Sequence, residues 1–231
     1  MEIKEFFDLY WKRRDFRRFD RYYDFLKGVN SDVFDKLSVF ENKKILAIGI
    51  GDTKDIEYLK RLGGDVISID ISSNALKADD RIHRIQMDAN EMGFKEDSFD
   101  TVFMRTVLLH LHHRKALLEI KRILHKGGRF FWIEPMKNNF FLWLYRFILS
   151  SGRFTKTDYL TYKEVQSFNR FFKNIYHREY FFVTVIFYPI SVLFPGTQNL
   201  IQKFVGIEKR IVDRFKWLKR FCWFSYGYGE I

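Results

Sequence analysis

Short apolar runs alternate with amphipathic segments along the first 136 residues of the chain. The amphipathic segments at about 54–62 and 116–128 have helical spacing, and a Gly-Gly pair stops each one. Buried strands are expected at 43–49, 65–72, 83–89, 98–106 and 129–135. Strands and helices that alternate at this spacing predict a parallel, doubly wound sheet.

The pattern changes on either side of this block. Residues 3–27 carry aromatic residues at helical spacings between Lys and Arg, which predicts one or two amphipathic helices. A strongly apolar helix is expected at 138–152, and Thr161 with Glu164 forms the capping-box pattern that opens a helix at 161–172. Two further strands are expected at 174–182 and 220–230.

The uncharged run "YFFVTVIFYPISVLFPGTQNLIQ" at 180–202 is long enough to span a bilayer. However, Pro189, Pro195 and Gly196 break it into pieces of one or two turns. This composition favours an apolar helical hairpin over a helix that spans a membrane.

Charge is unevenly distributed along the chain. The whole chain has a net charge of +11, of which residues 1–136 contribute +2 and residues 137–231 contribute +9. The second part also holds 26 of the 44 aromatic residues. A basic and aromatic half suits an anionic membrane surface or a nucleic acid, although a Phe-rich core with a solvated basic rim has the same composition.

The cysteine count and the N-terminus point to the compartment. Cys222 is the one cysteine, which excludes an intramolecular disulfide framework and a cysteine-ligated iron–sulfur cluster. The N-terminus is charged throughout, unlike a secretory signal. We therefore expect a reducing, cytoplasmic location.

The stretch "ILAIGIGDTKDIEYL" at 45–59 has the form of a nucleotide-cofactor turn. Gly49 and Gly51 follow a strand and precede a helix, whose free N–H groups can face an anionic group. Asp70 ends the next strand, where a carboxylate can accept both hydroxyls of a ribose. Lys54 stands where a dinucleotide site needs its last glycine, so an adenosyl cofactor other than NAD is favoured.

The block at 87–135 adds several independent motifs in order. It closely resembles the class I S-adenosylmethionine-dependent methyltransferases, in the branch that includes quinone-biosynthesis methyltransferases. The resemblance covers about residues 40–135, and weakly 161–182. The motifs that carry it are Asp88-Ala89, Gly93-Phe94, Ser98–Val102, Val107–Leu111 and Ala116–Gly128.

The resemblance implies a fold and a division of the chain. The expected fold class is α/β: a Rossmann-like, doubly wound, mostly parallel seven-stranded sheet with N-terminal helices and an apolar helical insertion, about 181–218, before the last strand. Residues 1–40 would form a helical cap and 41–136 the cofactor-binding core. Residues 137–231 would supply the substrate-side helices, the insertion and the closing strands of the same domain.

The resemblance also implies S-adenosylmethionine as the cofactor, with a role for particular residues. Gly49 and Gly51 would lie along its methionyl part. Asp70 would bind the ribose hydroxyls and Ile71 would pack on the adenine.

Three more residues would complete this cofactor site. Asp88 would accept from the exocyclic amine of the adenine, and Ala89 would offer a backbone N–H to the ring. Arg105 would line the cofactor cleft.

Two residues depart from the family's pattern. Ala47 stands where an acid is usual, and Thr53 stands where a glycine is usual. The missing acid would weaken recognition of the cofactor's amino group by about the worth of one charge-assisted hydrogen bond, ~1.5–3 kcal/mol. Asp52 and Asp55 are both candidates to replace it.

Two residues are candidates for catalysis. Glu134, at the end of a strand, would orient or deprotonate an acceptor hydroxyl, or would simply hold a loop. His110 would border the acceptor or begin a helix. No metal is expected, because no Cys or acid cluster accompanies His110, His112 and His113.

The apolar segments at 138–150 and 180–205 indicate the acceptor. They are more hydrophobic than a lid over a small polar substrate requires, and the surrounding half is basic. We predict methyl transfer by in-line displacement to an apolar or lipid-linked small molecule, with these segments resting peripherally on a membrane. The alternatives are an RNA methyltransferase that uses the basic, aromatic half, and a non-catalytic methyltransferase-like binding protein.

Overall fold

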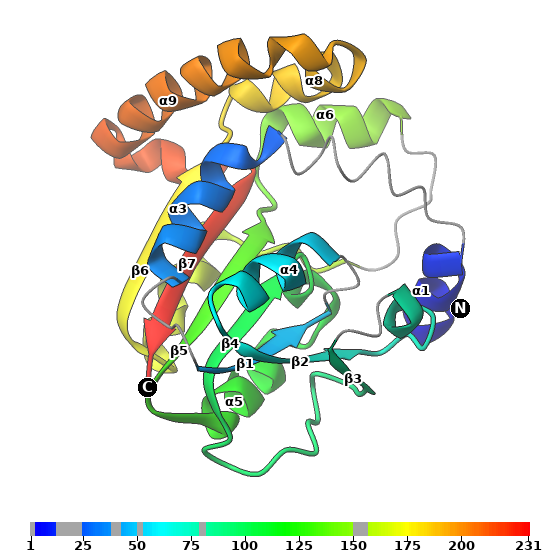
Figure 1. The fold of residues 1–231 in the computed structure, drawn as a ribbon. Helices are drawn as coiled ribbons and strands as arrows, with labels where there is room; N and C mark the ends of the chain where they lie inside the picture. Colours follow the sequence, from blue (N-terminus) through cyan, green and yellow to red (C-terminus); the bar gives the residue numbers. More distant parts are fainter. Residues whose placement is uncertain (1–2, 13–24, 38–42, 50–52, 79–81, 150–156) are drawn as a thin grey trace.

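A seven-stranded sheet forms the centre of the computed structural model, with strand order β3-β2-β1-β4-β5-β7-β6 (Figure 1). Strand β7 runs antiparallel to both of its neighbours, and all other pairs are parallel. The predicted doubly wound, mostly parallel sheet is therefore confirmed. The strands are β1 (Lys44–Ile48), β2 (Asp65–Asp70), β3 (His83–Gln86), β4 (Phe99–Arg105), β5 (Leu124–Pro135), β6 (Lys173–Tyr180) and β7 (Phe224–Glu230).

The structure describes residues 3–12, 25–37, 43–49, 53–78, 82–149 and 157–231. The α-helices within these ranges are α1 (Ile3–Lys12), α3 (Lys27–Leu37), α4 (Thr53–Arg61), α5 (His113–Ile123), α6 (Phe140–Leu149), α7 (Tyr162–Ser167), α8 (Tyr188–Leu193) and α9 (Gln198–Arg214). Short 3-10 helices are η2 (Ala75–Ala78), η3 (Leu108–His110), η4 (Phe168–Arg170), η5 (Thr184–Phe187), η6 (Pro195–Thr197) and η7 (Lys216–Phe221).

Apolar cores lie on both faces of the sheet because alternate side chains of each strand point to opposite faces. In β5, Phe131 and Ile133 join the core under α3, α4 and α9, whereas Phe130 and Trp132 join the core under α5 and α7. Figure 1 shows α3 and α4 in front of the sheet and α5 behind it. This two-sided burial explains the continuous apolar runs of the central strands β1, β2, β4 and β5. The strand at 83–86 was wrongly expected to be buried, because β3 lies at the edge of the sheet and is mostly exposed.

The boundary between α5 and β5 differs from the expectation. The helix ends at Ile123, four residues before the Gly-Gly pair at 127–128, and β5 begins at Leu124. Leu124 pairs with Phe99, and the next pair joins Thr101 to Arg129, so an irregularity separates the two pairs. Gly127 and Gly128 therefore lie within this irregular strand, and they do not end the helix.

The other expected elements of the second half are present. Thr161 and Glu164 form the predicted capping box, in which the Thr161 side chain accepts from the N–H of Glu164 and the Glu164 carboxylate accepts from the N–H of Thr161. The apolar run is broken into η5, α8, η6 and the start of α9, which form a helical insertion before β7. Among the described residues, no helix is both long enough and apolar enough to cross a membrane.

The winding of the sheet locates the site. From β1 the chain proceeds outward to β2 and β3, and then returns to the other side of β1 as β4 and β5. Ligands of open parallel sheets bind at the carboxyl ends of the strands where this reversal occurs. The turn after β1 and the segment after β4 lie at that point.

Candidate active site

A tight turn at Gly49 follows β1 at the carboxyl edge of the sheet. Gly49 has a φ of +65°, and its N–H donates to the carbonyl of Ile69 over 2.8 Å. A Cβ here would lie 2.3 Å from Cγ2 of Val107, so both the backbone conformation and the available space require glycine. Gly51 and Asp52 lie outside the described residues, and the role expected for Gly51 stays a prediction.

A buried ion pair lies beside this turn and joins the first turn of α4 to the end of β4. Arg105 donates from Nε and Nη2 to the two carboxylate oxygens of Asp55, over 2.7 and 2.9 Å. Because Ile48 pairs with Met104, Gly49 and Arg105 are the next residues on adjacent strands. In this fork geometry each charge compensates the burial of the other.

Of the two residues proposed to replace the usual acid of β1, the structure describes Asp55, and a contact between Asp55 and the cofactor stays a prediction. Ala47 is completely buried in the apolar core. Asp55, one of the two proposed substitutes, has both carboxylate oxygens on Arg105, which gives it a structural role. Arg105, expected to line the cofactor cleft, is itself buried in this pair, and a contact between Arg105 and the cofactor stays a prediction.

Asp70 lies at the end of β2, as expected for a residue that binds the ribose. Its Oδ1 accepts the N–H of Ser72 over 2.8 Å, and the side chain is almost fully buried. Burial raises the pKa of Asp70 to about 6, against the hydrogen bond from Ser72, which lowers it. Ile71 is partly buried beside it, and its carbonyl accepts from Nε2 of Gln86. The contacts of Asp70 and Ile71 with the cofactor remain predictions.

Helix α1 packs against this edge through side-chain contacts that no local sequence pattern indicated. Ser72 donates from Oγ to Oδ1 of Asp8 over 2.6 Å, and Asn74 donates from Nδ2 to the carbonyl of Asp8 over 3.0 Å. The hydrogen bond from Ser72 lowers the pKa of Asp8. On the same helix, Phe7 meets His110 edge to face, with ring centroids 4.9 Å apart. Helix α1 therefore contacts both the segment after β2 and the segment after β4.

Asp88 and Ala89 follow β3, where the adenine of the cofactor is expected. Asp88 is exposed, and its Oδ1 accepts from the N–H and the Nδ2 of Asn90, over 2.8 and 2.9 Å. Asn90 in turn accepts the N–H of His112 over 3.0 Å. Ala89 is buried. Asp88 thus shapes the loop with one oxygen, and its predicted contact with the adenine amine remains a prediction.

Glu134 is completely buried near the end of β5 and holds the segment after β4. Its Oε1 accepts the N–H groups of Val107 and Leu108, over 2.9 and 3.0 Å. Burial raises the pKa of Glu134 to about 7, against these hydrogen bonds, which lower it. Its Oε2 has no hydrogen-bond partner among the described residues. The geometry matches the loop-holding role, and proton transfer by Glu134 remains a prediction.

His110 closes the 3-10 helix that Glu134 holds. Its Nδ1 is buried without a hydrogen-bond partner in the part of the chain that the structure describes. Burial lowers the pKa of His110 to about 4, so the ring is neutral at pH 7. A neutral ring with an unused nitrogen can accept a hydrogen bond or a proton from a bound acceptor.

The other two histidines of this segment, His112 and His113, both contact other parts of the protein. His112 caps α5, and Nδ1 of His113 lies 3.4 Å from Oε1 of Glu164. The ring of His113, Asp158 and Glu164 have ligand atoms within 4.8 Å of one another. Nε2 of His113 lies 3.0 Å from the carbonyl of Asp158, so both ring nitrogens already face protein oxygens. The expectation of no metal stays a prediction.

The chemistry of this edge fits an adenosyl cofactor. The glycine turn follows β1, the first turn of α4 provides N–H groups, and Asp70 provides a carboxylate on the neighbouring strand. These groups come from adjacent strands at the point where the winding reverses. A Cβ at Gly49 would collide with the side chain of Val107, so the segment after β4 packs directly on this turn.

Comparison with known proteins agrees with this geometry. A family model described as "Methyltransferase domain" matches residues 46–132. "Putative methyltransferase YrhH" of Bacillus subtilis is 34% identical over 133 residues, which are 52% of this chain and 74% of that protein.

Solved structures share the fold at low identity. A chain of a complex that contains the Trm112 methyltransferase activator of Haloferax volcanii has a TM-score of 0.67 and 17% identity, and the match covers 97% of this chain and 96% of that one. Phosphoethanolamine N-methyltransferase 2 of Haemonchus contortus, in complex with S-adenosyl-L-methionine, has a TM-score of 0.59 and 17% identity, over 88% of this chain and 52% of that one.

Proposed function

Because the chain belongs to the class I S-adenosylmethionine-dependent methyltransferases, we propose that it transfers a methyl group to an apolar or lipid-linked small molecule. The observation that carries the acceptor class is an exposed aromatic pair on α6. Phe140 and Trp143 are 60% and 55% exposed, and their rings stack with centroids 6.0 Å apart. Helix α6 begins five residues after Pro135, at the carboxyl end of β5. An aromatic pair in this place favours an apolar acceptor.

A buried amide holds the start of α6 firmly. Nδ2 of Asn139 lies 2.9–3.1 Å from the carbonyl oxygens of Phe181, Phe182 and Phe221, and its Oδ1 accepts the N–H of Leu142. Asn139 thus ties α6 to both ends of the helical insertion. These hydrogen bonds fix the start of the helix that carries the aromatic pair.

Bound S-adenosylmethionine supplies a methyl group that its sulfonium already activates. The chain has to align an acceptor with that methyl, exclude water and accept a proton where the acceptor carries one. We assign to His110 the role of accepting a hydrogen bond from the acceptor, because its neutral ring has a buried, unused Nδ1. Glu134 acts as a positioning residue, because it holds the backbone that leads to His110.

A transfer assay tests the acceptor class. The purified chain is incubated with methyl-labelled S-adenosylmethionine and a cell extract, and label is then measured in the lipid, RNA and aqueous small-molecule fractions. Label in the lipid fraction, suppressed by S-adenosylhomocysteine, is expected. Label confined to RNA would support the rival function. Label confined to the aqueous fraction, or absent from every fraction while the chain binds the cofactor, would contradict an apolar acceptor.

A further inference from the structure

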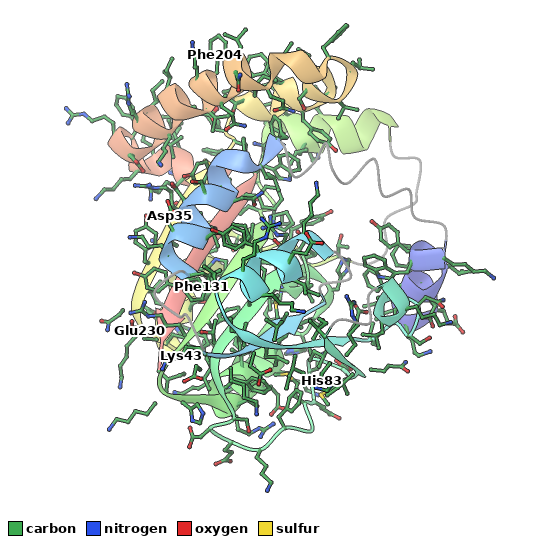
Figure 2. The ribbon with its side chains drawn as sticks, in the orientation of Figure 1. Asp35, Lys43, His83, Phe131, Phe204 and Glu230 are labelled. Atoms are coloured by element: carbon green, nitrogen blue, oxygen red, sulfur yellow. The ribbon has the colours of Figure 1, made fainter. Side chains whose placement is uncertain are left out.

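Helix α9 carries two apolar stripes, of which only one is buried. Ile201, Val205 and Val212 face the core. The second set, which we call the outer stripe, is spaced by four, three and four residues and therefore lies along one side of the helix. Its members are 44–57% exposed: Leu200, Phe204, Ile207 and Ile211. Figure 2 shows Phe204 on the side of α9 that faces away from the sheet.

Negative charge is directed away from the outer stripe. Glu208 and Asp213 are the only acids between residues 181 and 229. Glu208 is buried and accepts the N–H groups of Val183 and Thr184, over 2.6 and 2.8 Å. Asp213 lies 3.5 Å from Nη2 of Arg178. Both acids thus have internal partners.

Positive charge borders the outer stripe. Lys203, Arg210 and Arg214 are exposed and share one side of α9 by their spacing of seven and four residues, next to the outer stripe. We call them the basic flank. Among the described residues no carboxylate pairs with them, whereas Lys209, on the other side of the helix, lies 2.9 Å from Asp32. The basic flank remains available to an external anion.

The apolar surface continues beyond α9. Figure 1 shows α6, α8 and α9 gathered at the end of the molecule beyond the carboxyl edge of the sheet. Exposed apolar side chains of this size in one region mark a binding surface. Those on the insertion and η7 are Val183, Ile186, Ile190, Leu193, Phe194, Phe215 and Trp217.

We propose that the outer stripe and the basic flank bind an anionic lipid bilayer, with α9 lying in the plane of the interface. An amphipathic helix with Lys and Arg beside its apolar side binds such surfaces by burying apolar area and by electrostatic attraction. At 17 residues, α9 is about 26 Å long, which suits a helix that rests on a membrane. The basic flank favours an anionic surface over a second copy of the chain, since two copies would bring like charges together.

This proposal goes beyond the proposed function and does not depend on it. The lipid surface would be held by residues of α9, whereas the acceptor class rests on the aromatic pair of α6. Binding to vesicles can therefore be measured without cofactor or acceptor, and its failure would leave the methyl-transfer proposal standing.

Vesicle flotation with the full chain tests the proposal. Phosphatidylcholine vesicles are compared with vesicles of equal parts phosphatidylcholine and phosphatidylglycerol. We expect binding to the anionic vesicles, weaker binding at high salt, and little binding to the neutral ones. The double variant Phe204→Ser/Ile207→Ser is expected to bind about tenfold more weakly or less.

A matched control is Leu118→Ser, because Leu118 is an exposed apolar residue of 48% exposure on α5, away from this surface. It should float as the unaltered chain does. Equal flotation of the unaltered chain and the double variant would overturn the proposal, as would no flotation on anionic vesicles. Concentration-dependent dimers that the double variant abolishes, without lipid binding, would assign the surface to a second copy.

Discussion

Replacing Arg105 by methionine is expected to destabilise the fold strongly. The change removes the two hydrogen bonds and the positive charge that Arg105 provides to Asp55, a carboxylate that is 1% exposed. Loss of one partner of a buried ion pair costs about 3–5 kcal/mol in the free energy of unfolding. For a chain of this length, that corresponds to a fall in the melting temperature of roughly 6–20 °C.

The double variant Asp55→Leu/Arg105→Met tests whether the two buried charges compensate each other. Since both charges are then replaced by apolar side chains of similar volume, most of the lost stability should return. Urea unfolding measures Arg105→Met, Asp55→Leu and the double variant, and a double-mutant cycle gives the interaction energy between the two residues. Lys4→Met is the control, because it breaks an exposed pair with Asp8 and should leave the free energy of unfolding nearly unchanged.

Two outcomes would refute this reasoning. One is a cost for Arg105→Met no larger than that for Lys4→Met, which would mean that water reaches the Asp55 carboxylate. The other is a double variant that loses the sum of both single costs, which would mean that the two residues act independently.

Three more predictions concern the site. Gly49→Ala should abolish cofactor binding as measured by calorimetry. Gly127→Ala is the control and should bind the cofactor normally, because Gly127 also has a positive φ but an added Cβ would have nothing within 4 Å. Asp70→Asn should weaken cofactor affinity about tenfold or more by loss of a charge-assisted bond, and Asp65→Asn, at the other end of the same strand, should leave it unchanged. The pKa of Glu134 is raised from 4.5 to about 7, which predicts that the free energy of unfolding falls as pH rises from 4.5 to 7. Glu134→Gln should flatten this pH dependence in urea titrations. An unchanged pH profile would contradict the raised pKa of Glu134.

Most of the fold could be predicted from the sequence because its signals are local. Periodicity within a few residues predicted every strand of the sheet, and the capping box at Thr161 was found from two residues three apart. The end of α5 was predicted wrongly, since a Gly-Gly pair fits either a helix stop or an irregular strand. The pairing of Phe99 with Leu124, 25 residues later in the chain, decided between them.

The site was predictable only in part. The requirement for glycine at residue 49 followed from the turn pattern, and the structure supplies the reason in its positive φ and its contact with Val107. The pair Arg105–Asp55 and the bond Ser72–Asp8 join residues 50 and 64 positions apart. No local sequence pattern predicts such contacts, because they depend on which elements the fold brings together.

By itself, the sequence determined the strand and helix order and the position of the cofactor turn, since periodicity and turn geometry are properties of neighbouring residues. Only the tertiary structure decided which charged and apolar side chains are buried. It turned Glu208 inward and the outer stripe of α9 outward, although both lie on the same helix. It also placed Glu134 under the segment that leads to His110. Burial depends on what packs against a residue, and that is determined by contacts between distant parts of the chain.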